Sequence, residues 1–158
     1  MRMQVDREQE AADCFICRKH RGDIQVHGGT IYEDDLLYVG HISSNEKQAY
    51  LGYLIIDVKR HTPGLAELTE REAQSVGSML TRVSRALKAC EKAVHIYAAA
   101  LGDHVPHFHI HVIPRYSNTP PSFWGLQVRE WEGAPRGGQN QIEQVCSRIR
   151  AYLREDKG

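Results

Sequence analysis

Residues 107–112 alternate strictly between histidine and apolar side chains, with apolar Ile113 next, and this pattern constrains the fold more than any other segment. Successive side chains of a β-strand point to opposite faces of a sheet. We therefore expect His107, His109 and His111 to share one face, and the apolar residues between them to share the other. The apolar side can dock on helices, which leaves three imidazoles about 6 to 7 Å apart along a cleft.

Other short runs rich in β-branched and aromatic residues predict four more strands, separated by turn residues. These strands are expected at residues 30–34, 36–42, 49–57 and 94–100, and the histidine strand is expected to end at Pro114.

Two helices are predicted by apolar residues at spacings of three and four. The first follows a capping box formed by Thr69 and Glu72 and carries its apolar stripe as far as Cys90. The second is the C-terminal segment that contains Ile142, Val145 and Ile149. Together these elements predict an α+β fold with a five-stranded, mainly antiparallel sheet and two helices, in a single domain over residues 1–158.

The charge balance excludes one class of partner. The chain has 20 Lys and Arg residues against 20 Asp and Glu residues, so no net positive charge favours phosphate backbones, and we do not expect nucleic-acid binding. The polar segment 1–12 lacks the apolar core of a secretory signal, and no run is long enough for a membrane helix. Four cysteines without a secreted-type framework favour a reducing compartment, so we expect a cytoplasmic protein.

Three histidines on one face indicate chemistry, because crowded imidazoles that titrate near neutrality disfavour mutual protonation. Such a cluster suits either a metal centre or a nucleophilic and acid–base array that acts on phosphate, and composition alone does not separate the two. Single histidines elsewhere, namely His20, His27 and His95, are expected to be surface residues without a role.

The histidine segment resembles the signature of the histidine triad (HIT) nucleotide hydrolases and transferases, with Pro114-Arg115 as a common continuation. Residues 31–34, 54–61 and 65–72 resemble further family segments in the same order, so the likeness covers about residues 14–116. It implies that His109 attacks the α-phosphorus of a nucleoside phosphoramidate or a dinucleoside polyphosphate and forms a covalent nucleotidyl-histidine intermediate. It also implies that His111 binds phosphate oxygens, that His107 completes the triad, and that two chains pair as a homodimer.

A Cys-x-x-Cys motif at Cys14 and Cys17 lies in an N-terminal knuckle at about residues 12–28 and resembles that of zinc-containing bacterial members of the family. The likeness implies a structural zinc site completed by His61 and His107, with His104 as the alternative fourth ligand. In this interpretation the zinc braces the N-terminal segment behind the catalytic strand and does not activate water.

Three positions depart from the family pattern and bear on substrate binding. Asp103 and His104 stand where relatives carry Gln and Ser or Thr before the triad, and His41 stands where many carry an Asp that binds ribose. These departures keep two other functions open: a non-catalytic nucleotide- or zinc-binding protein, and a metal-dependent hydrolase that uses the strand histidines as ligands.

A C-terminal extension at about residues 117–158 carries Trp124 and Trp131 in an irregular stretch. We expect these side chains to cover the core or a dimer interface. The alternative is an aromatic wall that reaches the active site of a neighbouring subunit.

Overall fold

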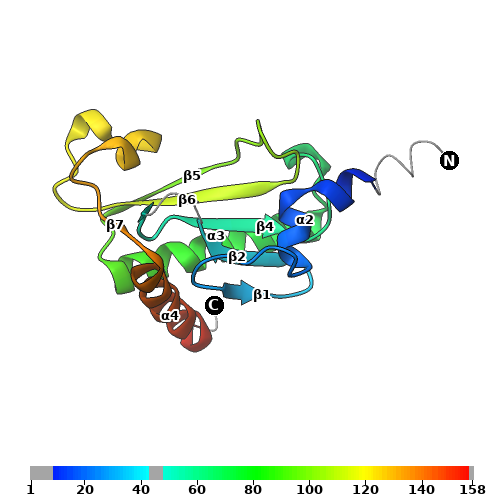
Figure 1. The fold of residues 1–158 in the computed structure, drawn as a ribbon, viewed down its shortest axis with the longest axis horizontal. Helices are drawn as coiled ribbons and strands as arrows, with labels where there is room; N and C mark the ends of the chain where they lie inside the picture. The colour runs from blue at the N-terminus through cyan, green and yellow to red at the C-terminus, as the bar shows by residue number, and fades with distance from the viewer. Residues whose placement is uncertain (1–8, 43–47, 157–158) are drawn as a thin grey trace.

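A five-stranded antiparallel sheet with the strand order β1-β2-β4-β6-β5 forms the centre of the computed structural model, which describes residues 9–42 and 48–156 (Figure 1). The α+β prediction is confirmed. The strands are β1 (Thr30–Glu33), β2 (Leu37–His41), β4 (Leu54–Val58), β5 (His95–Ala99) and β6 (His109–Arg115). The predicted single domain and the polar N-terminal segment both extend into residues outside the described ranges.

The prediction of one strand over residues 49–57 is wrong, because the segment divides at a glycine turn. Gly52 has φ +83°, a left-handed conformation that favours glycine, and a side chain there would collide with the Tyr116 hydroxyl. On one side of the turn, β3 (Ala49–Tyr50) pairs with β7 (Arg136–Gly137) in a separate two-stranded sheet. On the other side, β4 enters the central sheet.

The histidine strand also differs from its prediction, because it begins at His109 and continues through Pro114. Pro114 lies opposite Ile96 of β5, and its carbonyl accepts a hydrogen bond of 2.6 Å from the Tyr50 hydroxyl on the other side of the strand. The pairing between β6 and β4 ends at Val112. A backbone N–H at position 114 would point to the β4 side, where β6 no longer has a strand partner. Proline therefore removes no hydrogen bond from the sheet.

Helices α3 (Glu70–Glu91) and α4 (Gln139–Glu155) cover one face of the sheet and form its main core. The predicted capping box is present, since the Glu72 N–H donates to Thr69 Oγ1 at 3.2 Å and the Thr69 N–H donates to Glu72 Oε2 at 2.9 Å. The helix-facing side of the sheet and the two helices share a contiguous set of buried residues: Leu54, Ile56, Val112, Val83, Leu87, Ile142, Val145 and Ile149. None of the helices in residues 9–42 and 48–156 is long and apolar enough to cross a bilayer.

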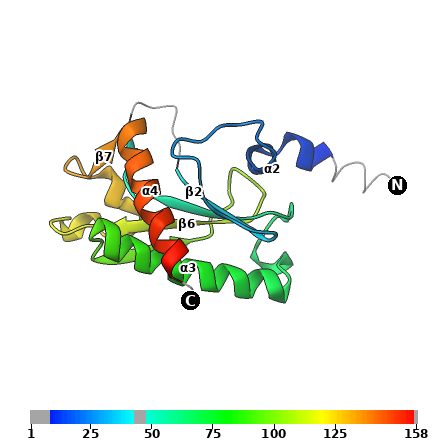
Figure 2. The same ribbon diagram turned by 90° about the horizontal axis from the view of Figure 1, so that it is seen from below.

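The opposite face of the sheet carries the short helix α2 (Phe15–His20), which lies across the sheet from α3 in Figure 2. Toward the other end of this face, the C-terminal extension packs on the sheet through a second buried apolar cluster that joins Tyr53 and Ile113 to Val128. The extension contains the 3₁₀ helices η2 (Pro121–Phe123) and η3 (Gly125–Glu130). Trp131 packs against this cluster, whereas Trp124 is half exposed and lies over the Arg115 guanidinium.

Candidate active site and metal centre

His109 and His111 lie side by side on β6, on the face that α2 covers. Their ring centroids are 4.9 Å apart, and in the register with β4 they lie opposite Asp57 and Ile55. His107 precedes the strand and is fully buried, and its ring packs against His20 and His61. The predicted alternation therefore brings two of the three imidazoles together at the surface of the sheet and turns the third toward the N-terminal segment.

The backbone carbonyl of His107 holds one nitrogen of His109. His109 Nδ1 lies 2.7 Å from this oxygen. A carbonyl oxygen only accepts hydrogen bonds, so Nδ1 carries a proton, and in the neutral ring the lone pair is therefore on Nε2. This is the tautomer that a histidine nucleophile needs.

Tyr53 holds His111 through a hydrogen bond that the sequence does not reveal. The Tyr53 hydroxyl lies 2.7 Å from His111 Nδ1, and Tyr53 is buried. Burial raises the pKa of Tyr53, so the phenol keeps its proton. Burial, and then the neighbouring His109 and Arg129, lower the pKa of His111 to about 4, so its imidazole is neutral at physiological pH.

A second cluster, made of side chains of the types that bind metals, lies around the start of α2. One ligand atom from each of Cys14, Cys17, His61 and His107 lies within 4.8 Å of all the others. His107 Nδ1 is 3.5 Å from Cys14 Sγ and 3.4 Å from Cys17 Sγ, and His61 Nδ1 is 3.4 Å from Cys17 Sγ. The ligand distances typical of zinc would place sulfur and nitrogen about 3.6 Å apart in a tetrahedron. The spacing therefore fits a closed Cys₂His₂ site.

Protonation at this cluster also fits metal binding. His107 Nε2 donates to the Val58 carbonyl at 2.5 Å, which leaves the Nδ1 lone pair facing the cysteines. Burial lowers the pKa of His107 to about 4, which keeps the ring neutral, as a ligand must be. Burial and the nearby Cys14 raise the pKa of Cys17 to about 11, so a thiolate at this position needs a cation beside it. The alternative ligand His104 is exposed and lies outside the cluster.

Between the two sites, a buried acid joins α2 to the sheet. Asp57 Oδ2 pairs with the Lys19 ammonium and lies 3.2 Å from His20 Nε2, while Oδ1 has no hydrogen-bond partner among the described residues. Burial alone would raise the pKa of Asp57, but the hydrogen bonds from His20 and Lys19 outweigh it and hold the pKa below its usual range. The expectation that His20 is a surface residue without a role is wrong, because its side chain is 9% exposed and its ring packs edge-on against His107.

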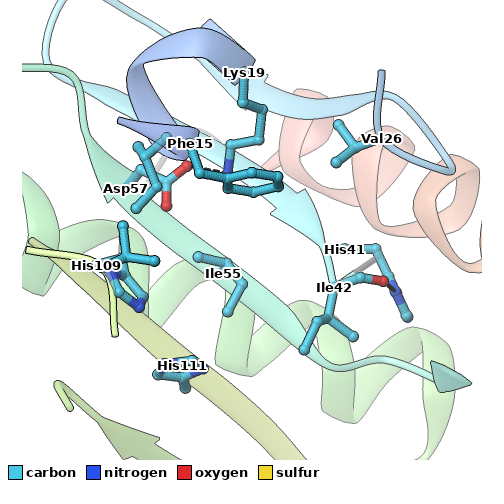
Figure 3. Close-up of a pocket in the computed structure, with 11 residues that line it drawn as sticks. Phe15, Lys19, Val26, His41, Ile42, Ile55, Asp57, His109 and His111 are labelled. Carbon is cyan, nitrogen blue, oxygen red and sulfur yellow. Dashed lines mark hydrogen bonds and ion pairs between the residues drawn. The ribbon is translucent and has the colours of Figure 1, made fainter. Parts of the chain in front are cut away.

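A pocket of about 170 Å³ lies between α2 and the sheet (Figure 3). His109 and His111 line it from β6, and Ile55 and Asp57 line it from β4. From α2, Phe15, Ile16 and Lys19 complete the opposite wall. The pocket thus combines an apolar surface with two imidazoles and one buried carboxylate.

The structure places the remaining predicted substrate-binding residues differently. His41 lines the pocket but uses both ring nitrogens, since Nδ1 donates to the Ile42 carbonyl at 2.7 Å and Nε2 accepts from the Gly52 N–H at 2.9 Å. Neither nitrogen is therefore left for a sugar hydroxyl. Asp103 and His104 are both exposed, and Val105 is the residue of their loop that lines the pocket.

Comparison with known proteins agrees with this geometry. The model of the HIT domain family matches residues 25–118, which is more than half of the chain. The chain belongs to the HIT family. A relative described as an uncharacterized HIT-like protein, from Borreliella burgdorferi, is 27% identical over an alignment of 113 residues that covers 67% of this chain and 78% of the relative.

Solved HIT structures have the same fold. A histidine triad protein from Bradyrhizobium japonicum is 26% identical, with a TM-score of 0.61, over 78% of this chain and 89% of its own. A zinc-bound histidine triad family protein from Mycobacterium smegmatis has a TM-score of 0.67 over 92% of this chain and 96% of its own, with 20% identity. At this level of identity, the similarity to the Mycobacterium smegmatis protein shows only that the two chains share a fold.

Sequence patterns missed Tyr53, Lys19 and Asp57 as parts of the site. Asp57 had a signal, since it is the one charged residue in the apolar run 49–58. Tyr53 and Lys19 had none, because their roles depend on partners 58 and 38 positions away along the chain.

Proposed function

We propose that this HIT protein is a nucleotide hydrolase or nucleotidyltransferase that works through a covalent nucleotidyl-His109 intermediate. The observation that carries the proposal is the 2.7 Å hydrogen bond from His109 Nδ1 to the His107 carbonyl, which directs the Nε2 lone pair away from the backbone. A nucleophile held in one tautomer requires no deprotonation before it attacks.

In the first step, His109 Nε2 forms a bond to the α-phosphorus of the substrate, and the bond from phosphorus to the leaving group breaks. The leaving group departs with the electron pair and takes up a proton from the solvent. In the second step, the oxygen of water attacks the same phosphorus and gives up a proton to the solvent, the phosphorus–nitrogen bond breaks with its electron pair returning to His109 Nε2, and a nucleoside monophosphate is released. If a phosphate or a sugar phosphate replaces water, the same steps give transfer instead of hydrolysis.

His111 and Asp57 have complementary parts in this proposal. Tyr53 can donate its phenolic proton to His111 Nδ1, which leaves the Nε2–H of His111 to donate to a phosphate oxygen. Asp57 lines the same pocket, and its Oδ1 is buried without a hydrogen-bond partner among the described residues, so a sugar hydroxyl that displaces the cover over this atom can donate to it in place of His41. The two substrates that the resemblance implies, a nucleoside phosphoramidate and a dinucleoside polyphosphate, each carry a phosphate oxygen and a sugar hydroxyl for these contacts.

We also propose that Cys14, Cys17, His61 and His107 hold zinc. When bound, the ion would cross-link the N-terminal segment to the strand that carries the histidines, and this closed set of four protein ligands is typical of a structural site. The donors favour this arrangement over a hydrolase that binds one metal through all three strand histidines, because His107 turns its free nitrogen to the cysteines and His109 Nδ1 is occupied by a carbonyl. A cytoplasmic location and pairing of two copies are further parts of the proposal, and sedimentation velocity tests the pairing.

The decisive experiment incubates the protein with adenosine phosphoramidate and with diadenosine polyphosphates labelled at the α-phosphorus. We expect an acid-labile nucleotidyl adduct on the wild-type chain and none on His109→Ala. Turnover that persists in His109→Ala would refute the nucleophile. Binding of nucleotide without any adduct or turnover would instead support the non-catalytic alternative.

A further inference from the structure

The phosphate end of the proposed site has little positive charge of its own. The loop before the triad contributes the exposed carboxylate of Asp103, which repels phosphate. Lys19, the cation in the pocket wall, is paired with Asp57. Because His111 is neutral, the negative charge of a phosphate and of its transition state must be balanced by another group.

The C-terminal extension packs on the face of the sheet that carries the histidines. Ile113 lies two residues after His111 on β6 and therefore shares its face. Val128 of η3 is fully buried and belongs to the same apolar cluster as Tyr53 and Ile113. This contact anchors η3 beside the tyrosine that holds His111.

Arg129, the next residue, projects a guanidinium group toward this tyrosine. Its Cζ lies 5.8 Å from the centroid of the Tyr53 ring, and the Tyr53 ring centroid lies 5.8 Å from that of His111. The charge of Arg129 contributes to the lowered pKa of His111, after burial and His109, so its field reaches the site. The side chain of Arg129 is exposed and has no hydrogen-bond or ion-pair partner among the described residues, whereas its carbonyl accepts a hydrogen bond from Arg136 that holds the turn.

The guanidinium of Arg115 already has other partners. Its guanidinium lies 3.8 Å from the Trp124 ring centroid and donates to the Tyr97 hydroxyl at 3.0 Å. Among the described residues, Arg129 is thus an arginine close to Tyr53 and His111 whose guanidinium remains available to an anion.

We propose that Arg129 binds the phosphate of the substrate held at His109 and His111, so that the C-terminal extension completes the catalytic site of its own chain. This inference rests on the proposed function and adds a phosphate-binding residue to it. A guanidinium group offers five N–H donors in a planar fork that matches phosphate oxygens. The extension would thereby replace the Gln and hydroxyl that relatives carry at the positions of Asp103 and His104.

The test separates the phosphate from the rest of the nucleotide. Calorimetric titrations with adenosine 5′-monophosphate, adenosine and inorganic phosphate are compared for wild type, Arg129→Gln, Arg129→Lys and Arg85→Gln. Arg85 is exposed on α3, which covers the opposite face, so its replacement removes the same charge far from the site. Thermal unfolding of each variant checks that the fold is retained.

We expect Arg129→Gln to weaken binding of the monophosphate at least tenfold and to leave adenosine binding within twofold of wild type. Arg129→Lys should lie between the two, since it keeps the charge but loses the fork, and Arg85→Gln should match wild type. An unchanged monophosphate affinity in Arg129→Gln would overturn the inference, even if the His109 adduct forms as proposed. So would a wild-type chain that binds neither the monophosphate nor inorganic phosphate. If phosphate binding depends on Arg129 but no adduct ever forms, the inference stands and the covalent mechanism fails.

Discussion

The hydroxyl of Tyr53 and Nδ1 of His111 lie 2.7 Å apart, although the two residues are 58 positions apart in the chain. If the phenol fixes the tautomer of His111, Tyr53→Phe should reduce kcat about tenfold, which corresponds to about 1.4 kcal/mol of transition-state stabilisation, with a smaller effect on KM. Tyr50→Phe is the matched control, because it removes a buried hydroxyl that donates to the Pro114 carbonyl on the same side of the molecule. Equal losses of activity in the two variants would show that Tyr53 acts only through stability.

The protonation of His111 gives a pH prediction. Its pKa of about 4 in the folded chain lies below the value of 6.5 for an ordinary histidine, chiefly because of burial. The unfolded chain therefore takes up this proton at a higher pH than the folded chain does. The contribution of His111 to stability should be complete above pH 6.5 and should be lost as the pH falls toward 4.

This dependence is measured by urea unfolding of wild type and His111→Gln between pH 4 and pH 8. Wild type should lose stability more steeply than His111→Gln below pH 6.5. The imidazole proton signals that disappear in His111→Gln should also stay unshifted from pH 8 to pH 5. A midpoint near 6.5 for those signals would contradict the prediction.

Metal content tests the four-residue cluster independently of activity. We expect about one zinc ion per chain in purified wild type, and loss of that zinc in Cys17→Ser together with a lower unfolding temperature. Cys90→Ser and His104→Ala should keep the zinc, since Cys90 lies on α3 and His104 is exposed outside the cluster. Zinc that remains bound in Cys17→Ser but is lost in His104→Ala would reverse the assignment of ligands.

The pair of Lys19 and Asp57 predicts strong coupling between α2 and the sheet. Lys19→Met should destabilise the chain by about 3–5 kcal/mol, because it leaves the Asp57 carboxylate buried with only His20 beside it. The double variant Lys19→Met with Asp57→Asn should be more stable than Lys19→Met alone, because the second change removes the buried charge. Unfolding in urea at saturating zinc measures both, and strictly additive losses would show that the two residues are not coupled.

Local patterns predicted much of the fold. The capping box at Thr69, the apolar stripes of α3 and α4, and the alternation in β6 each specify an element through residues close together in the chain. They failed where a distant contact decides the conformation. The run 49–57 divides because Gly52 packs against Tyr116, and β6 tolerates Pro114 because its pairing with β4 ends at Val112.

The candidate site was predictable to a similar extent. The cysteine and histidine ligands of the proposed zinc site and the two strand histidines carry recognisable spacings, and the structure brings each group together. Asp103 and His104 were expected near the substrate from their places in the family pattern; both are exposed, and of their loop Val105 lines the pocket. Arg129 has no sequence signal, because its proximity to His111 depends on how the C-terminal extension packs around Val128.

His107 serves both sites at once, through different atoms. Its ring faces the cysteines, its Nε2–H donates to Val58, and its backbone carbonyl fixes the proton of His109. A shift of this one residue would be transmitted to the nucleophile without passing through any side chain of the pocket. If zinc binds as proposed, the ring of His107 and the hydrogen bond that orients His109 therefore belong to one connected unit, although the metal ligands and the nucleophile are different side chains.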